Sequence, residues 1–340
     1  MPETVPGIQF DNDGVCLFCR EFTPFSPDGE DKLKELVRNS RNAGSEYDCI
    51  VPLSGGRDSS YVLFYAVKKL GMKALAVNFN NEFQIEQAKK NIETTCAALD
   101  TELLSIRSGN DSMHKIVRNG LLSVEPFWNP NLCRGCSYGY RSVVYRTAEE
   151  KNIPLILWGE SEAESTSRIT SVINANLNTA PKWKKLLNPY FFLCELEAYK
   201  QQKEFHVDGN PAFIRTDPEL KNPAVIQVKV YNYIEWDRAV IKDAIASLGW
   251  KKPEGHISTW RSDCSLHKYV NYCYWKTLGC TKDCLGYCNM INSGKMNRDE
   301  ALKQEEFMIE KITDNLTDFL QNEFGFSETI IRKLCPDYNV

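Results

Sequence analysis

Apolar runs alternate with amphipathic stretches along much of the chain, and this alternation predicts a parallel β-sheet covered by helices. YDCIVPL at 47–53 and IPLILWGE at 153–160 have the length and the branched, aliphatic composition of buried strands. The stretches between such runs have the helical spacing of apolar positions. Strands that alternate with helices in this way are typical of a doubly wound α/β fold. The predicted elements are strands at 47–53, 73–80, 101–108 and 153–160 and helices at 57–71, 82–100 and 137–152.

The same pattern divides the chain into three predicted parts. Residues 1–30 lack periodicity and are rich in Gly, Pro and Asp, which indicates an extended arm that carries two cysteines. Residues 31–250 form the α/β domain, in which the Asn-, Lys- and Pro-rich stretch 161–223 is expected to be an insertion or lid. Residues 224–236 are expected to add a further strand. Residues 251–340 have helical patterning and several cysteines, so they are expected to form a Cys-rich helical region.

Composition and charge indicate a soluble globular protein. The chain has 340 residues, of which 42% are hydrophobic and 25% charged, and its formal net charge is −4 at pH 7. This acidic balance disfavours a nucleic-acid partner, because proteins that bind nucleic acid electrostatically are usually basic. No apolar run reaches the roughly 20 residues of a transmembrane helix, and the N-terminal residues lack the pattern of a secretion signal. We therefore expect a cytoplasmic protein without a membrane partner.

The segment between the first predicted strand and the first predicted helix has the composition of a phosphate-binding loop. Adjacent glycines let the backbone approach an anion closely, and the amide groups and dipole of the following helix stabilise negative charge. Hydroxyl groups add donors, and Asp58 is expected to hold Mg²⁺, because a carboxylate that faced phosphate directly would repel it. The Gly-Lys-Ser/Thr ending of a Walker loop is missing. The residues of the segment are Ser54, Gly55, Gly56, Arg57, Asp58, Ser59 and Ser60.

The sequence SGGRDS at 54–59 resembles the PP-loop of the N-type ATP pyrophosphatases, the adenine nucleotide α-hydrolase superfamily. The resemblance covers about residues 45–160 and implies a Rossmann-like fold with ATP as cosubstrate. It implies that a substrate oxygen is adenylated, that pyrophosphate leaves, and that a nitrogen or sulfur nucleophile then displaces AMP. It also implies that adenine is contacted near the end of the second strand, which here is Val77, Asn78 and Phe79.

Residues after the fourth predicted strand are further candidates for the same site. Gly159 and Glu160 either place a carboxylate near the nucleotide or Mg²⁺ or form a solvated acidic turn. Arg57 and Arg141 are the arginines favoured to neutralise phosphate. The histidines form no sequence cluster, so each is expected to be structural or solvated. They are His114, His206, His256 and His267.

Segments at both ends of the chain resemble the N-acetyl sugar amidotransferases of surface-polysaccharide synthesis. They are PGIQFDNDGVCLFCREF, YDCIVPLSGGRDSSY and SGKMNRDEAL. That group uses ammonia to convert an acetamido group into an acetamidino group, and its members often carry a second CxxC upstream of the Met-Pro that starts this sequence. Here only Cys16 and Cys19 are present, which is half of a closed zinc site. Either further ligands come from elsewhere, such as the cysteines at 273–288, or this CxxC holds no metal.

Thirteen cysteines in a cytoplasmic protein favour metal binding or catalysis over disulfides. The stretch CRGCSYGYRSVVYRTAEE at 133–150 resembles the CxxC helix of iron–sulfur-dependent tRNA thiolases. The resemblance implies that Cys133, Cys136 and a distant third cysteine ligate a [4Fe–4S] cluster whose fourth iron carries sulfur, and an open iron position suits the delivery of sulfide. Cys264 is the candidate third ligand, and a structural zinc or a chance pair are the alternatives. The competitors of Cys264 are Cys273, Cys280, Cys284 and Cys288.

These features favour an ATP-dependent sulfur transferase that acts on a small molecule. A carbonyl or lactam oxygen, such as that of a purine in 6-thioguanine formation, would be adenylated at the loop and replaced by sulfur from sulfide or a persulfide. The first alternative is a sugar amidotransferase that receives ammonia from a glutaminase, and the second is a noncatalytic nucleotide- and metal-binding sensor. The expected cofactors are ATP, Mg²⁺, the [4Fe–4S] cluster and, at Cys16 and Cys19, Zn²⁺. The chain is compatible with a homodimer.

Overall fold

The computed structural model describes most of the chain outside the predicted insertion. The described residues are 1–41, 44–107, 111–123, 133–160, 169, 172, 206–207, 210–211, 220, 222–254, 263–312 and 314–336. The insertion predicted at 161–223 therefore lies outside the described residues, apart from the short strand pair β5 (His206–Val207) and β6 (Asn210–Pro211) and a few single positions. None of the described helices has the length and apolar character to span a membrane.

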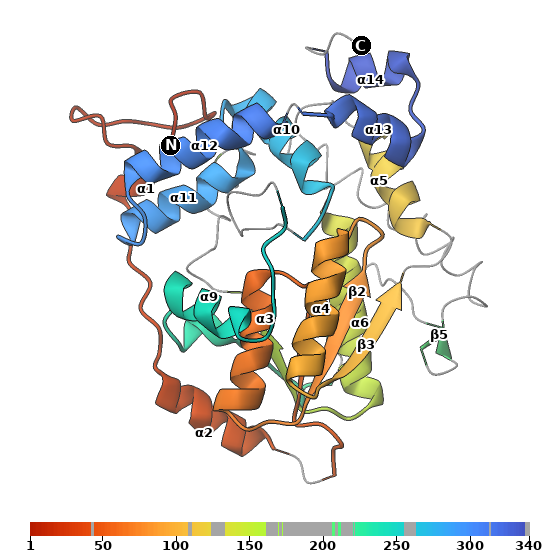
Figure 1. The fold of residues 1–340 in the computed structure, drawn as a ribbon. Coiled ribbons are helices and arrows are strands. Elements are labelled where there is room, and N and C mark those ends of the chain that lie inside the picture. Colours follow the sequence, from red (N-terminus) through yellow and green to blue (C-terminus); the bar gives the residue numbers. More distant parts are fainter. Residues whose placement is uncertain are drawn as a thin grey trace.

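A five-stranded parallel sheet forms the centre of the molecule (Figure 1). Its strand order is β3-β2-β1-β4-β7. All neighbouring strands of this sheet pair in parallel. Strands β2 and β3 lie on one side of β1, whereas β4 and β7 lie on its other side. The strand order therefore reverses between β1 and β4. Ligands of such sheets bind at the carboxyl ends of the strands at this reversal. The strands are β1 (Cys49–Pro52), β2 (Ala74–Asn80), β3 (Glu102–Arg107), β4 (Leu155–Trp158) and β7 (Ile226–Lys229).

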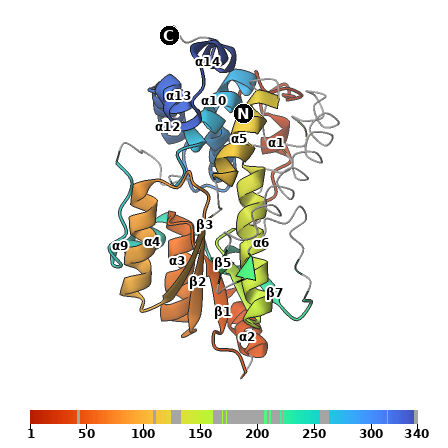
Figure 2. The ribbon, with the colours of Figure 1, turned by 90° about the vertical axis from the view of Figure 1, so that its right-hand side faces the viewer.

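Helices cover both faces of the sheet, which confirms the predicted doubly wound α/β fold. Helices α3, α4 and α9 pack on one face and α5 and α6 on the other (Figure 2). Ile50 of β1 belongs to the core under α5 and α6, whereas its neighbours Cys49 and Val51 belong to the opposite core, because successive strand side chains point to opposite faces. These helices are α3 (Arg57–Phe64), α4 (Glu86–Ala98), α5 (Ser112–Ser123), α6 (Arg134–Glu150) and α9 (Arg238–Ala246).

The C-terminal helices lie beyond the carboxyl ends of the strands, together with α1 of the N-terminal arm, whereas α2 lies at the opposite end of the molecule (Figure 1). Tyr269, Leu278 and Leu316 of this region are buried in the same core as Ile50. The helical region is therefore continuous with one face of the sheet. Its helices and those of the arm are α1 (Leu17–Arg20), α2 (Glu30–Ser40), α10 (His267–Leu278), α11 (Lys282–Asn292), α12 (Arg298–Ile312), α13 (Leu316–Phe324) and α14 (Glu328–Leu334).

Three elements differ from the sequence prediction. Helix α5 forms between the strand predicted at 101–108 and the helix predicted at 137–152, where the sequence predicted no element. The helix predicted at 57–71 continues from α3 as a π-helical turn, Tyr65–Lys69, which is a rare variant that local patterns do not reveal. The strand predicted at 224–236 is limited to β7, because the chain leaves the sheet through a 3₁₀ turn, Val230–Asn232. Tyr231 in this turn donates a hydrogen bond to the Asp58 carbonyl (3.4 Å). The segment after β7 therefore covers the predicted phosphate loop instead of extending the sheet.

Candidate nucleotide and thiol site

The predicted phosphate loop, residues 54–60, joins β1 to α3 beside the reversal of strand order. Gly55 has a φ of +81°, and a Cβ on it would collide with the backbone carbonyl of Ala88. A Cβ on Gly159, after β4, would lie 3.3 Å from the backbone nitrogen of Ser59. The glycines therefore permit three backbone segments to meet, and Gly159 lies next to the loop. Its predicted role in nucleotide binding stays a prediction.

The hydroxyl groups of the loop divide into two kinds. Ser54 and Ser59 are half-buried, with 3.2 Å between their Oγ atoms, and Ser54 Oγ accepts a hydrogen bond from the Gly56 amide (3.2 Å). Ser60 is fully buried and donates to the Gly56 carbonyl (2.8 Å). A ligand can reach the first pair, whereas Ser60 stabilises the turn from within, and its predicted contact with phosphate stays a prediction.

Arg57 and Asp58 form an ion pair inside the loop. The Arg57 guanidinium, 3% exposed, donates to both carboxylate oxygens of Asp58 at 3.0 and 2.8 Å. The guanidinium carbon lies 4.8 Å from the centre of the Trp236 ring, and the indole N–H of Trp236 donates to Asp58 Oδ1 (2.9 Å). A Mg²⁺ ion bound at Asp58 would share the carboxylate with Arg57, and the predicted metal role of Asp58 stays a prediction.

The residues predicted to contact adenine lie in β2 with buried side chains. Val77, Asn78 and Phe79 are each less than 10% exposed. The Asn78 amide group donates to the Leu53 carbonyl (2.8 Å), and its oxygen accepts from Ser105 (3.1 Å). Asn78 therefore holds β1, β2 and β3 together at the carboxyl edge of the sheet, and its predicted contact with adenine stays a prediction.

The three cysteines predicted to hold a cluster lie close together. Cys133 is the residue that precedes α6, and Cys136 lies in its first turn. The amide nitrogen of Asn81, directly after β2, is 3.1 Å from Cys136 Sγ and 4.0 Å from Cys264 Sγ. Burial raises the pKa of the Cys264 thiol well above its usual value, and Cys136, Asp263 and Cys133 raise it further. Cys264 is thus close enough to both cysteines of the CxxC pair for their charges to act on its thiol, but the three described sulfurs do not all lie within 4.8 Å of one another.

Cys264 is held in place by backbone pairing with the segment after β2. Gln84 and Cys264 form an isolated antiparallel bridge, the Ile85 amide donates to the Asp263 carbonyl (3.1 Å), and the Ser265 amide donates to the Phe83 carbonyl (2.9 Å). The Gln84 side chain donates to the Ser54 carbonyl (2.9 Å). The same short segment therefore contacts both Cys264 and the phosphate loop.

A second group of polar side chains lies after β4. Glu160 accepts hydrogen bonds from Arg141 at 2.9 and 3.1 Å, and Arg141 lies over the Trp158 ring at 5.0 Å. Burial and the charge of Glu160 raise the pKa of Tyr140 to about 12, so Tyr140 stays protonated and donates to Glu160 (3.1 Å). A cavity of about 290 Å³ opens here, at the carboxyl ends of β4 and β7. It is lined by Arg141, Trp158, Glu160, Gln227, Val228, Lys229, Asn232 and Tyr233.

A larger cavity, of about 420 Å³, lies at the opposite end of the sheet, where strands β2 and β3 begin. Its lining includes Lys73, Ala74, Thr101 and Glu102, which begin β2 and β3. Binding sites of parallel sheets form at the carboxyl ends of the strands. We therefore assign no ligand to this cavity, although it is the larger of the two.

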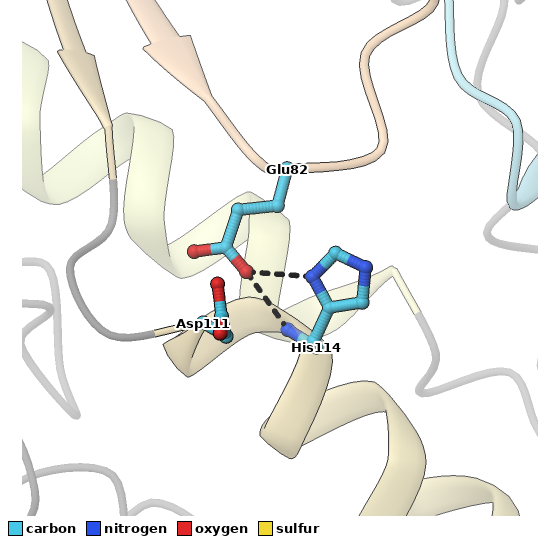
Figure 3. Close-up of side chains that lie close together, drawn as sticks. All are labelled: Glu82, Asp111 and His114. Atoms are coloured by element: carbon cyan, nitrogen blue, oxygen red, sulfur yellow. Dashed lines mark hydrogen bonds and ion pairs between the residues drawn. The ribbon is translucent and has the colours of Figure 1, made fainter. Parts of the chain in front are cut away.

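Three side chains that could ligate a metal ion lie close together, those of Glu82, Asp111 and His114 (Figure 3). Among the described residues, no other set of three has all its ligand atoms within 4.8 Å of one another. The Glu82 side chain is fully buried and accepts from the His114 ring (2.9 Å) and from the His114 amide (3.1 Å). The other ring nitrogen of His114 contacts Glu323 of α13. Both ring nitrogens are therefore engaged, and His114 joins α5 to α13, in line with the structural role expected of it.

Several side chains that hold the site were not identified from the sequence. Asn81 and Gln84 lie one and four residues after the end of β2. Polar residues at the carboxyl end of a parallel strand indicate a ligand-binding site, so the sequence could have revealed these two. Trp250 donates to the Gly55 carbonyl (3.0 Å), and Asn91 donates to the same oxygen (3.3 Å). No local pattern indicates the roles of Trp236 and Trp250, because their contacts are with residues 178 and 195 positions away in the sequence.

Cys16 and Cys19, the other predicted metal ligands, lie in the arm at α1. Cys19 is hydrogen-bonded to Asn292, the last residue of α11. Their neighbours are thus the C-terminal helices, and the two CxxC pairs have different surroundings.

The chain is similar to a curated protein and to two enzymes of known structure, and no family model matches it. The uncharacterized protein MJ1599 of Methanocaldococcus jannaschii is 23% identical over 201 residues, which span 58% of this chain and 67% of that protein. The NMN synthetase of Francisella tularensis aligns at 12% identity with a TM-score of 0.39, over 89% of this chain and 98% of that one. The NH3-dependent NAD synthetase of Campylobacter jejuni, in complex with nitrate, aligns at 17% identity with a TM-score of 0.32, over 66% and 96%. Alignments with such low TM-scores carry no argument about function.

Proposed function

We propose that this chain is an N-type ATP pyrophosphatase that transfers sulfur to a small molecule. The loop at 54–60 binds the pyrophosphate part of ATP, and a carbonyl or lactam oxygen of the acceptor attacks the α-phosphorus. Pyrophosphate leaves, and the oxygen becomes part of an adenylate. Sulfide, supplied as such or released from a persulfide by an external thiol that is oxidised to a disulfide, then bonds to the activated carbon, and AMP leaves with the former carbonyl oxygen.

The position of Cys264 is the observation that carries this proposal. It lies 183 positions from Asn81 in the sequence, yet one amide group contacts both Cys264 and Cys136. The segment that pairs with Cys264 also contacts the phosphate loop through Gln84. Three thiols next to a loop that forms an activated leaving group are a suitable arrangement for sulfur chemistry, whereas an ammonia-using enzyme needs no thiols there.

The donor set fits an iron–sulfur cluster held by Cys133, Cys136 and Cys264. Three thiols are present, and a fourth protein ligand is not required where one iron stays open. Burial and the nearby cysteines disfavour the Cys264 thiolate, so a bound cation would have to compensate its negative charge. When bound, the cluster supplies an iron with an open position for sulfide. Asn81 orients the thiol of Cys136.

The cavity between β4 and β7 is the candidate acceptor site. Its volume of about 290 Å³ is at the low end of small-molecule sites. Its aromatic walls, Trp158 and Tyr233, suit a flat ring, and Glu160, which is paired with Arg141, offers hydrogen bonds with little net charge. A purine or a similar small lactam matches this lining.

The test is to incubate the anaerobically purified protein with ATP, Mg²⁺, sulfide and a panel of purines. We expect AMP, pyrophosphate and a thiocarbonyl product in equal amounts, detected by mass spectrometry. The Cys264→Ala variant should still release pyrophosphate at a reduced rate but form no sulfur product, whereas Cys96→Ala, a buried cysteine on α4, should behave as the parent protein. Pyrophosphate release that depends on ammonia and not on sulfide would overturn the proposal. No release with any acceptor would leave a nucleotide-binding sensor.

A sugar amidotransferase is the second candidate, and one contact favours it. The segment SGKMNRDEAL at 293–302 resembles that group, and here its Met296 packs in a cluster with Trp236, which contacts Asp58. Lys295 also donates to the Trp236 carbonyl (2.9 Å). Incubation with ¹⁵N-labelled ammonia and N-acetyl sugar nucleotides separates the two candidates, because only the amidotransferase incorporates the label.

A further inference from the structure

Gln227 of β7 lines the cavity between β4 and β7, and two neighbours fix the orientation of its amide group. The Tyr145 hydroxyl oxygen lies 2.9 Å from Gln227 Oε1, and the indole nitrogen of Trp158 lies 3.2 Å from the same atom. An indole N–H can only donate a hydrogen bond, so the atom of Gln227 that faces Trp158 must be the amide oxygen. The amide nitrogen is therefore the atom of Gln227 that is left for a ligand.

The hydrogen of the Tyr145 hydroxyl is committed to the same oxygen. Arg141 Nη1 lies 3.3 Å from the Tyr145 oxygen, and a guanidinium has donors but no acceptor. Tyr145 therefore accepts a hydrogen bond from Arg141 and donates one to Gln227. Tyr145 is 5% exposed and Trp158 4% exposed, so a reversed Gln227 amide would leave two buried donors facing an NH₂ group. The amide group is thus held in one orientation.

The cavity combines the donors of Gln227 with an acceptor on Glu160. Within the described part of the chain, the NH₂ group of Gln227 has no protein partner, and it offers two N–H donors. The Glu160 carboxylate lines the same cavity and accepts three hydrogen bonds from Arg141 and Tyr140. A carboxylate has about four acceptor sites, so Glu160 can accept one more. The lining therefore matches a ligand that carries both an acceptor atom and an N–H group.

We propose that Gln227 selects the acceptor substrate by donating to an unprotonated ring nitrogen of a purine whose N–H donates to Glu160. This inference rests on the proposed function for the assignment of the cavity as the acceptor site. The carbonyl oxygen of the acceptor must stay free to bond to the α-phosphorus, so the atom that Gln227 contacts is a different one. Purines carry unprotonated ring nitrogens as well as N–H groups. A lactam whose one acceptor atom is the reacting oxygen would leave the Gln227 donors unsatisfied, and sites that hydrogen-bond a ligand reject such analogues strongly.

The first test uses the parent protein and needs no variant. Hypoxanthine and its 3-deaza and 7-deaza analogues are titrated calorimetrically with Mg²⁺ and the α,β-methylene analogue of ATP present, so that no adenylation occurs. In each deaza analogue one ring nitrogen is replaced by C–H, which cannot accept a hydrogen bond from Gln227. We expect one analogue to bind at least about tenfold more weakly than hypoxanthine and the other to bind like it. Equal affinity for all three ligands, or no binding of any, would overturn the proposal.

Gln227→Glu reverses the hydrogen-bonding character of the group that faces the ligand. A carboxylate oxygen still accepts from Tyr145 and Trp158, but the NH₂ donors are lost. Hypoxanthine should bind at least about tenfold more weakly than to the parent protein, and its advantage over the sensitive analogue should shrink to less than about twofold. Gln321→Glu makes the same change of charge at an exposed position of α13 and should bind hypoxanthine as the parent protein does. An undiminished advantage of hypoxanthine in Gln227→Glu would contradict the role of Gln227.

These results are separable from the test of sulfur transfer. Discrimination between the deaza analogues without any sulfur product would contradict the proposed function and support the role of Gln227. A sulfur product formed with equal kcat/KM from hypoxanthine and from both analogues would support the proposed function and contradict the role of Gln227.

Discussion

At Gly55 the backbone has a φ of +81° and passes directly against the carbonyl of Ala88. The Gly55 carbonyl accepts hydrogen bonds from Trp250 and Asn91, so the peptide is held from both sides. A glycine is required here by the conformation and by the close approach together. The shape of the phosphate loop therefore depends on the backbone more than on any single hydroxyl group.

Replacing Gly55 by alanine should lower the free energy of unfolding by about 2–4 kcal/mol, because overpacking adds to backbone strain. Pyrophosphate release should fall at least about tenfold, as the loop must shift. Gly71→Ala is the matched control: its φ is +60°, but a Cβ there meets only open space, so strain alone should lower the free energy of unfolding by about 1–2 kcal/mol. Urea denaturation measures both variants, and equal destabilisation would contradict the clash with Ala88.

His114 should make stability depend on pH. Burial lowers its pKa, but hydrogen bonds and charges of Glu82 and Glu323 raise the pKa by more. A pKa that is raised on folding stabilises the protein most below the ordinary histidine value of about 6.5, and this contribution disappears as the pH rises through the raised value. His114→Gln should therefore lower the free energy of unfolding by about 1–3 kcal/mol at low pH and by less at high pH. Thermal melts of the parent protein and of His114→Gln, from pH values below about 6.5 to values above it, check this prediction. A destabilisation by His114→Gln that grows with pH would be inconsistent with the pairing of His114 with Glu82 and Glu323.

At the scale of elements, the helices and strands supply only part of the candidate nucleotide and thiol site. Irregular segments supply the rest. The strands and helices place the loop at 54–60 and the start of α6, but the segment at 263–265 and the chain after β7 supply Cys264 and Trp236. Trp236 contacts both members of the Arg57–Asp58 pair. The segment after β7 thus fixes the orientation of the charged residues in the loop.

Trp236→Phe should disturb this pair while keeping most of the packing. Loss of the N–H donor to a carboxylate is worth about 1.5–3 kcal/mol, so we expect kcat/KM for ATP to fall by about 10- to 100-fold. Trp275→Phe on α10, which is remote from the loop in sequence and is not among the residues that contact Asp58, should leave kcat/KM for ATP unchanged. Equal values for both variants would show that Trp236 does not position Asp58.

The sequence predicted the local parts of this site well and its long-range contacts poorly. Short sequence patterns predict the sheet, the phosphate loop and the helix at the second CxxC, because each of these depends on residues that are neighbours in the sequence. Cys264 was proposed as a partner of Cys136 from its residue type and the resemblance alone. Its pairing with Gln84 depends on a chain reversal that no local pattern specifies. The shortened strand β7 was mispredicted for the same reason, since Tyr231 leaves the sheet to contact the loop.

At the scale of the whole molecule, the C-terminal helices and the N-terminal arm pack into the same core as one face of the sheet. Tyr269, Leu278 and Leu316 share this core with Ile50, and so does Val5 of the arm. The carboxyl edge of the sheet is therefore enclosed by segments from both ends of the chain. The three cysteines at this edge, Cys133, Cys136 and Cys264, are each partly exposed, so a ligand can reach them.

Iron and sulfide analysis of anaerobically reconstituted protein tests the central claim, that Cys133, Cys136 and Cys264 together hold a cluster beside the phosphate loop. We predict about four iron and four sulfide ions per chain, with the electron paramagnetic resonance signal of a [4Fe–4S] cluster after reduction. Cys264→Ala should hold less than about a quarter of this iron, and Cys96→Ala should hold all of it. A parent protein that stays free of iron, or a Cys264→Ala variant with a complete cluster, would contradict the account.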